Sequence, residues 1–259
     1  MALSSDLKCG VRKEATNGSV IYVITLADGE NRFYPESIER INKALDSIEG
    51  DCRGLDPTTK SGLIITGENK YFSVGLDLQS FYKGDPENVQ KYFERTYCRL
   101  IARIVTWPMI TIAAINGHAI AGGLVLALAC DYRVMGGAGQ RGWLAMNEIQ
   151  LPSSIPTGML AILQAKLGGR PDVLRECLLQ GHRFNSQEAK DDGWIDLLAD
   201  SPKAVLESAL MLAKEKGHVA KKGPFVQVIK QSMYRDALKI LLGHEQLDHF
   251  KFAMSINKI

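Results

Sequence analysis

An uncharged apolar stretch, Met109–Cys130, limits the folds that this chain can adopt. Its 22 residues are enough to cross a bilayer as one helix. However, Asn116-Gly117-His118 interrupts the stretch and Gly122-Gly123 follows shortly afterwards. Because asparagine and glycine favour turns, we predict a buried strand over 109–115 and a buried helix that opens near Gly122. A membrane span is therefore not expected, and the mean hydropathy of −0.07 agrees with this.

Elsewhere, short β-branched runs alternate with amphipathic segments. Apolar residues at Ile38, Ile41, Leu45 and Ile48 share one helical face, and Pro35 stands in the first turn of that helix. Strands that alternate with helices, followed by a helical C-terminal third, predict an α/β fold with a core domain over 1–200 and a helical region over 201–259. Further strands are expected at 19–26, 62–66, 132–135 and 194–198, and helices at 35–48, 86–106, 157–166, 171–180, 186–191, 202–216 and from 224 to near the end.

Composition excludes several classes of protein. The 259 residues have a net charge of +2, which gives no indication of a nucleic-acid partner. The five cysteines are scattered and none has C-x-x-C spacing, so neither a zinc site nor a disulfide framework is expected, and a reducing compartment is the simplest interpretation. The N-terminus lacks the pattern of a signal peptide. The last residues, Asn257-Lys258-Ile259, share only the lysine of a peroxisomal S-K-L tail.

Two segments resemble known binding motifs, but their residue spacing does not fit a nucleotide or a metal site. Gly137–Gly142 matches G-x-G-x-x-G, but too few residues separate it from Pro152 for the crossover helix of a dinucleotide site. His244 and His249 resemble H-E-x-x-H with one residue too many, which turns the two imidazoles about 140° apart on a helix. We interpret the first segment as a surface loop and the second as a solvated helix face.

Two glycine-bearing segments carry the functional signal. The first is Phe72-Ser-Val-Gly-Leu-Asp77; the second runs from Asn116-Gly117 through Gly122-Gly123 to Cys130-Asp131. Together they resemble the crotonase superfamily of enoyl-CoA hydratases and isomerases, over roughly residues 20–200. The resemblance implies the crotonase (ClpP-like) fold, a repeated ββα core with a helical C-terminal part, and chemistry on acyl-CoA thioesters.

Acyl-CoA chemistry of this type passes through a thioester enolate, whose oxygen needs hydrogen-bond donors. Two backbone N–H groups supply them without reorganisation, each worth about 3 kcal/mol in comparable oxyanion holes. The resemblance places these donors at Leu76 and Gly122. Gly122 also opens a predicted helix, where unpaired N–H groups favour an anion.

The acid–base group distinguishes the possible reactions. Many hydratases of this family carry two glutamates, and here the first position is Val125 while the second matches Glu148. Leu144, Met146, Ile149 and Leu151 surround Glu148 in the sequence and suggest an apolar setting that raises its pKa towards the range of a general base.

One carboxylate suffices to move a double bond, whereas adding water commonly uses two. The sequence is similar to the Δ3,Δ2-enoyl-CoA isomerase branch, in which the base takes a proton from C2 of a 3-enoyl-CoA and returns it at C4, in fatty-acid β-oxidation. One alternative is a hydratase or another enolate-forming member of the family. The other is a non-catalytic homologue that binds acyl-CoA or RNA.

The resemblance also implies the remaining contacts. Arg32 is the candidate for a coenzyme A phosphate, and the backbone of Ser73 and Val74 for the adenine. No metal and no separate cofactor is expected, since coenzyme A belongs to the substrate. The family implies a homotrimer or hexamer, assembled in part through 201–259, in a peroxisomal or otherwise cytoplasmic location. Further substrate-binding positions are Gly75, Asp77, Gly123 and Val125.

Overall fold

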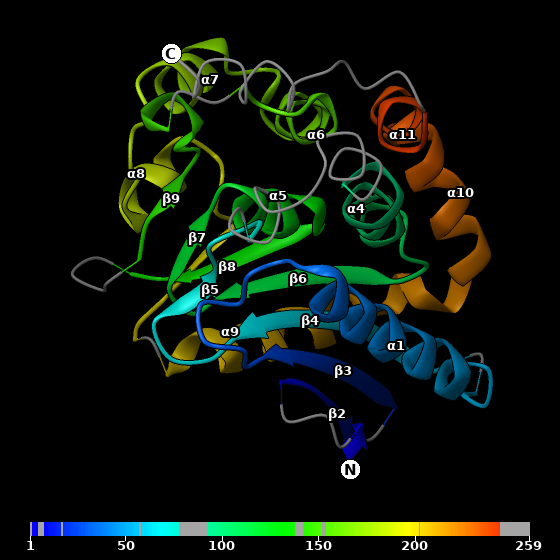
Figure 1. The fold of residues 1–259 in the computed structure, drawn as a ribbon. Helices are drawn as coiled ribbons and strands as arrows, with labels where there is room; N and C mark the ends of the chain where they lie inside the picture. Colours follow the sequence, from blue (N-terminus) through cyan, green and yellow to red (C-terminus); the bar gives the residue numbers. More distant parts are fainter. Residues whose placement is uncertain are drawn as a thin grey trace.

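The computed structural model describes residues 2–4, 8–16, 18–56, 58–77, 93–137, 142–151, 154–201 and 203–243. A seven-stranded sheet in the order β1-β2-β3-β4-β6-β8-β10 forms its centre (Figure 1). β1 and β2 pair antiparallel, and from β3 to β10 all neighbours are parallel. The strands are β1 (Ala2–Ser4), β2 (Cys9–Thr16), β3 (Ser19–Leu26), β4 (Lys60–Gly67), β6 (Ile110–Ile115), β8 (Tyr132–Gly136) and β10 (Leu197–Ala199).

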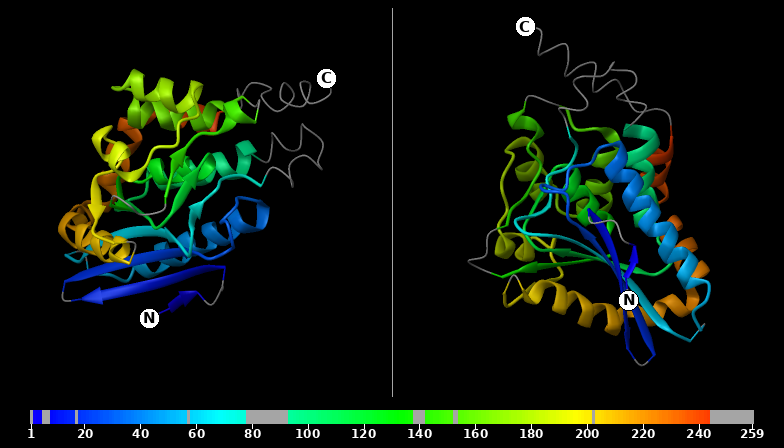
Figure 2. Two further views of the ribbon diagram at one scale, coloured as in Figure 1. Left: turned by 90° about the vertical axis from the view of Figure 1, so that its left-hand side faces the viewer. Right: turned by 60° about the horizontal axis from the view of Figure 1, so that its bottom comes forward.

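Helices cover both faces of this sheet, so the parallel strands are apolar on both sides. Ile21 and Val23 pack on one face with Ala209 of α9 (Ala204–Lys216), whereas Tyr22 and Ile24 belong to the larger core on the other face. That core contains residues of α1 (Pro35–Cys52), α4 (Cys98–Val105) and α5 (Gly122–Ala129). The right-hand view of Figure 2 shows α9 (gold) lying along its own face of the sheet.

A second sheet of only three short strands lies beside α5. It consists of β5 (Tyr71–Ser73), β7 (His118–Ile120) and β9 (Leu144–Ala145), in that order and all parallel. The N–H of Ala119 donates to the carbonyl of Trp143 at 2.9 Å, and the N–H of Ala121 donates to Ala145 at 2.8 Å. The carboxyl ends of three distant segments therefore meet at one edge.

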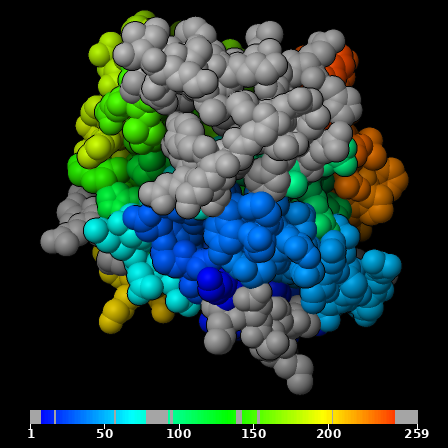
Figure 3. Space-filling model, in the orientation of Figure 1, coloured from blue at the N-terminus to red at the C-terminus, as the bar shows by residue number. Residues whose placement is uncertain are grey.

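The C-terminal part of the described chain is helical, as predicted. In Figure 3 the first third of the chain, blue to cyan, forms a band across one face, and the last helices, orange to red, lie at its right-hand edge. The elements are α6 (Thr157–Leu167), α7 (Pro171–Leu179), α8 (Ser186–Asp191), η3 (Gly217–Lys222), α10 (Gly223–Met233) and α11 (Arg235–Leu242).

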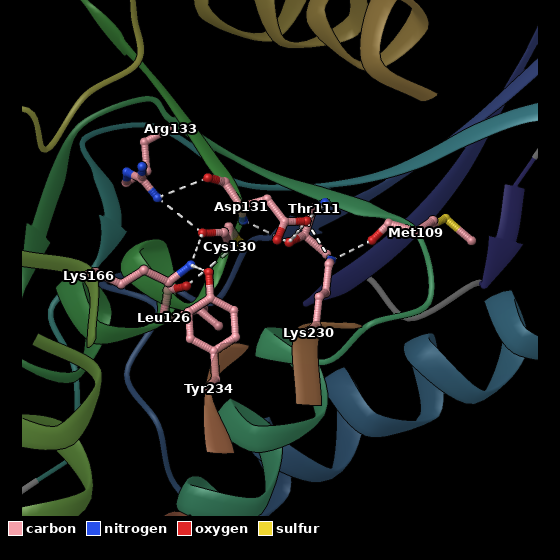
Figure 4. A network of polar contacts seen from close by, with 9 residues as sticks. All are labelled: Met109, Thr111, Leu126, Cys130, Asp131, Arg133, Lys166, Lys230 and Tyr234. Atoms are coloured by element: carbon pink, nitrogen blue, oxygen red, sulfur yellow. Dashed lines mark hydrogen bonds and ion pairs between the residues drawn. The ribbon is translucent and has the colours of Figure 1, made fainter. Parts of the chain in front are cut away.

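A buried polar network fastens α10 to the large sheet (Figure 4). Lys230 of α10 places its Nζ 2.5 Å from Oδ2 of Asp131 and 2.8 Å from the carbonyl oxygen of Met109. The same carboxylate oxygen accepts the N–H of Thr111 at 2.8 Å. Asp131 is thus held by a strand residue and a helix residue at once, which joins the two elements.

Most predicted elements are confirmed, and three differ from expectation. The predicted strand 194–198 starts later, at Leu197, because the N–H groups of Trp194 and Ile195 bond to Ala189 of α8. The single helix expected from 224 is broken at Tyr234, whose backbone leaves helical geometry at φ −107° and ψ 20°.

The third difference concerns the helix expected over 86–106. Residues 78–92 lie outside the described ranges, and from Phe93 the chain forms a π-helical turn, η1 (Phe93–Tyr97), before α4. Across the described ranges, no helix is both long and apolar enough to cross a membrane, which agrees with the interpretation of 109–130 as a strand and a helix.

Candidate active site

The three residues that sequence analysis assigned to catalysis all stand at the carboxyl edge of the small sheet. Leu76 follows β5, Gly122 follows β7 and Glu148 follows β9, each within three residues of the end of its strand. Neighbouring strands are about 4.8 Å apart. Because β7 is the central strand, the segment with Gly122 lies between the segment that follows β5, with Leu76, and the segment that follows β9, with Glu148.

Hydrogen bonds to Phe33 orient the loop that carries Leu76. The N–H of Phe33 donates to the carbonyl of Gly75 at 2.8 Å, and the N–H of Asp77 donates to the carbonyl of Phe33 at 3.0 Å. In such a parallel bridge Phe33 bonds to the residues on either side of Leu76, and the backbone N–H of Leu76 itself points away from the Phe33 strand.

Gly75 brings this loop against the start of α5. Its φ of +85° suits glycine, and a Cβ at this position would lie 2.6 Å from the N atom of Gly122. Ser73 supports the turn, since its Oγ donates to the carbonyl of Asn31 at 2.7 Å and accepts the N–H of Gly75 at 3.1 Å. The two predicted oxyanion donors thus sit on segments in direct contact.

Gly122 is the first residue of α5, where an N–H has no partner within the helix. In the described part of the chain, neither this N–H nor that of Leu76 donates to another residue. Ala121, which precedes it, has an unfavourable φ of +50°. A Cβ on Gly123 would come within 2.1 Å of the carbonyl oxygen of Ser73, so glycine is required there for α5 to pack on β5.

Glu148 begins a short 3₁₀ turn, η2 (Glu148–Gln150), and only 8% of the residue is exposed. Its Oε2 atom is buried and has no hydrogen-bond partner among the described residues. Burial raises the pKa of Glu148 to about 7, although the backbone N–H groups of Glu148 and Asn147 partly oppose this. A carboxylate with this pKa can take and return a proton near neutral pH.

The apolar setting of Glu148 is confirmed, but half of the residues expected to form it do not. Leu144 and Met146 are buried, whereas Ile149 is 50% exposed and Leu151 is 44% exposed. The turn after Glu148 points these two side chains outwards. Burial raises the pKa of Tyr97 and of Cys177, and the nearby charge of Glu148 adds to both shifts.

The structure also gives the surroundings of three other predicted residues. Arg32 is paired with Glu30 at 2.7 Å, and it lines a pocket that also contains Lys8 and Arg40. The N–H of Val74 donates to the carbonyl of Glu30. Val125 is fully buried within α5.

Two of the motif-like segments extend beyond the described residues. Of Gly137–Gly142 the structure describes only the two ends, and His244 and His249 lie outside the described residues. Within the described ranges, His, Cys, Asp and Glu side chains form no group of three or more that could hold a metal ion.

Sequence analysis missed Tyr97. This residue ends the π-helical turn and is buried, and its hydroxyl donates to the carbonyl oxygen of Gly122 at 2.6 Å. The available signal was a tyrosine on the apolar face of the predicted helix, because a buried phenol normally needs a hydrogen-bond partner.

Comparison with known proteins places these features in a family. The sequence matches the enoyl-CoA hydratase/isomerase family over residues 16–253. It is 33% identical to the peroxisomal enoyl-CoA delta isomerase 2 of Arabidopsis thaliana over 85% of this chain and 91% of that protein. It is 31% identical to enoyl-CoA delta isomerase 3 of the same plant, with the same coverage.

A solved structure agrees with the sequence relatives. The crystal structure of human mitochondrial delta3-delta2-enoyl-CoA isomerase superposes with a TM-score of 0.78 and 25% identity, over 96% of this chain and 92% of that chain. The predicted crotonase fold is thereby confirmed.

Proposed function

The chain belongs to the enoyl-CoA hydratase/isomerase family, and we propose that it is a Δ3,Δ2-enoyl-CoA isomerase. The main support for this proposal is Glu148, the one carboxylate residue that is buried in the described part of the chain. One of its oxygens has no hydrogen-bond partner there, and its pKa is about 7. Position 125, where many hydratases of this family carry a second glutamate, holds a buried valine. The names of the similar proteins support the same reaction.

In the proposed mechanism the thioester carbonyl of a 3-enoyl-CoA accepts the N–H groups of Leu76 and Gly122. Glu148 removes the proton at C2, and the electron pair of the C–H bond moves into a dienolate whose oxygen the two N–H groups stabilise. The same proton returns at C4, which leaves a trans-2-enoyl-CoA. No other reactant is consumed, since the proton leaves and returns through one carboxyl group.

The experiment compares two substrates with the purified protein. We expect 3-hexenoyl-CoA to be converted to the trans-2 isomer and crotonyl-CoA to be hydrated poorly or not at all. Glu148→Gln should lower kcat about 100-fold or more, because glutamine cannot accept the proton. The exposed Glu207 provides the matched control, and Glu207→Gln should leave kcat unchanged. Hydration without isomerisation would instead favour the hydratase alternative.

The assembly and location of the protein extend this proposal. Several apolar side chains of α10 are exposed in the single chain, Phe225 to 71%, and they support the homotrimer or hexamer that the family implies. A peroxisomal location is supported by the name of one similar protein. The tail Asn257-Lys258-Ile259 lies outside the described residues. A fluorescent fusion at the N-terminus, with and without these three residues, tests whether they direct import.

A further inference from the structure

We infer that Tyr97 is a positioning residue that holds both halves of the oxyanion hole in register. The inference rests on the proposed enolate chemistry and assigns a role to a residue outside the expected set of site residues. Tyr97 does not donate to the substrate oxygen itself. It acts through Gly122 on one side and through Phe33 on the other.

The contact with Gly122 is direct. The Tyr97 hydroxyl donates to the Gly122 carbonyl oxygen at 2.6 Å, and a Cβ on Gly122 would lie 3.1 Å from the same hydroxyl oxygen. Glycine has the widest range of backbone angles, and Gly122 follows the strained Ala121. The Gly122 carbonyl belongs to the peptide that follows Gly122, so the Tyr97 anchor fixes that peptide plane. Through the Gly122 Cα this limits the rotation of the preceding peptide, which carries the Gly122 N–H.

The contact with the Leu76 loop passes through an aromatic ring. The Tyr97 ring lies 5.4 Å from the Phe33 ring and 5.5 Å from the Phe93 ring, centroid to centroid. The backbone of Phe33 is bonded to Gly75 and Asp77, on either side of Leu76. The Tyr97 side chain thus contacts Gly122 directly and contacts Phe33, which orients the loop with Leu76.

The hydroxyl is the informative part of this side chain. A phenylalanine would fill the same space without the cost of burying a polar group. Burial holds the pKa of Tyr97 well above its usual value, and the charges of Cys98 and Glu148 add to the shift. The phenol therefore stays protonated and remains a donor while the base is ionised. The π-helical turn that delivers Tyr97 is a geometry often found at functional sites.

The test uses Tyr97→Phe, which keeps the ring and removes only the hydroxyl. Tyr22 offers a matched control, since it is fully buried and donates to Asp51 at 2.6 Å, on a strand far from the small sheet in sequence. We expect Tyr97→Phe to lower kcat about tenfold with little change in KM, and Tyr22→Phe to change neither.

A second readout isolates the oxyanion hole from turnover. Acetoacetyl-CoA forms an enolate that absorbs in the near ultraviolet, and stabilisation by the two N–H groups lowers the pH at which the bound ligand ionises. Tyr97→Phe should raise that pH by about one unit, corresponding to the same tenfold loss, and Tyr22→Phe should not. A purely structural role would lower the melting temperature and leave the ionisation of the bound ligand unchanged.

The outcomes separate the two proposals. If the unaltered protein stabilises the enolate and Tyr97→Phe stabilises it equally, the role of Tyr97 is overturned while the proposed function stands. If the unaltered protein binds acetoacetyl-CoA without stabilising its enolate, the oxyanion hole itself is wrong, and both proposals fall.

Discussion

The burial of Glu148 links catalysis to stability through a single proton. Its pKa in the folded protein is about 7, against an ordinary value of 4.5. Between these two pH values the folded chain binds more protons than the unfolded chain, so stability falls as the pH rises through this window. The proposed base becomes active over the upper part of the same range, because only the carboxylate accepts a proton.

Glu148→Gln should therefore remove activity and increase stability at alkaline pH. Above pH 7 the variant should exceed the unaltered protein by up to about 3 kcal/mol in free energy of unfolding, because no charge remains to be buried. Urea unfolding at pH 5 and pH 8 measures this difference. An equal stability difference at both pH values would contradict the assigned burial of charge, and Glu207→Gln should show no pH-dependent gain.

Gly75 is the second residue whose substitution separates strain from function. A Cβ there would collide with the N atom of Gly122, whereas Gly193 has a similar φ of +80° with nothing within 4 Å of an added Cβ. Gly193→Ala should lower the free energy of unfolding by about 1 kcal/mol, because alanine is strained at a positive φ. Gly75→Ala should lower the free energy of unfolding by more than this and should also lower kcat strongly. Thermal unfolding measures the first effect and the isomerase assay the second. Full activity in Gly75→Ala would refute the close contact of the two loops.

Sequence patterns located these residues but not their surroundings. Gly75, Gly122 and Glu148 stand in recognisable motifs. The orientation of Ile149 away from the site depends on the 3₁₀ turn after Glu148, and the Tyr97 contact depends on a π-helical turn. Both turns are set by tertiary packing, which apolar periodicity does not reveal.

Among the elements, α10 depends most on one buried ion pair. The Lys230 and Asp131 side chains are 8% and 16% exposed, and loss of one partner leaves the other charge buried. Lys230→Met should destabilise the protein by about 3–5 kcal/mol. Lys43→Met provides the control, because its pair with Glu39 is solvent-exposed and should contribute less than about 1 kcal/mol. Similar losses in the two variants would argue against the anchoring of α10 by Lys230.

Several long elements were predictable, whereas the strands of the small sheet were not. The helix α1 is long enough to display a helical period, and the strands β3 and β4 are long enough to display a continuous apolar run; their apolar residues are buried as expected. The strands of the small sheet have two or three residues each, too few for any alternation to be recognised. They form because distant segments are brought side by side by the larger fold.

For the whole molecule, the exposed apolar stripe on α10 predicts self-association. Phe225, Val228, Ile229 and Met233 are all more than half exposed and recur at helical spacing on one side of α10. Light scattering coupled to size exclusion should give the mass of a trimer or hexamer. Ile229→Glu should shift this mass towards the monomer, whereas Gln231→Glu, off the stripe, should not. A monomeric unaltered protein would contradict the prediction.

Fold class and architecture followed from the alternation of strands and helices along the chain, and the family resemblance supplied the topology. The division at residue 200 and the assembly role of 201–259 stay predictions. Apolar surface on a single chain indicates that something covers it, but the stoichiometry depends on the angle between copies, which no local pattern encodes.

The three-stranded sheet has an evolutionary consequence. In the proposed mechanism each strand delivers a separate chemical component, so recognition of the thioester oxygen and transfer of the proton are encoded in different stretches of sequence. On this mechanism, substitutions after β9 or at position 125 would alter the proton transfer, while the segments after β5 and β7 would still bind the same carbonyl. Diversification of catalysts on this scaffold then requires changes at a few separable positions, without redesign of the whole framework.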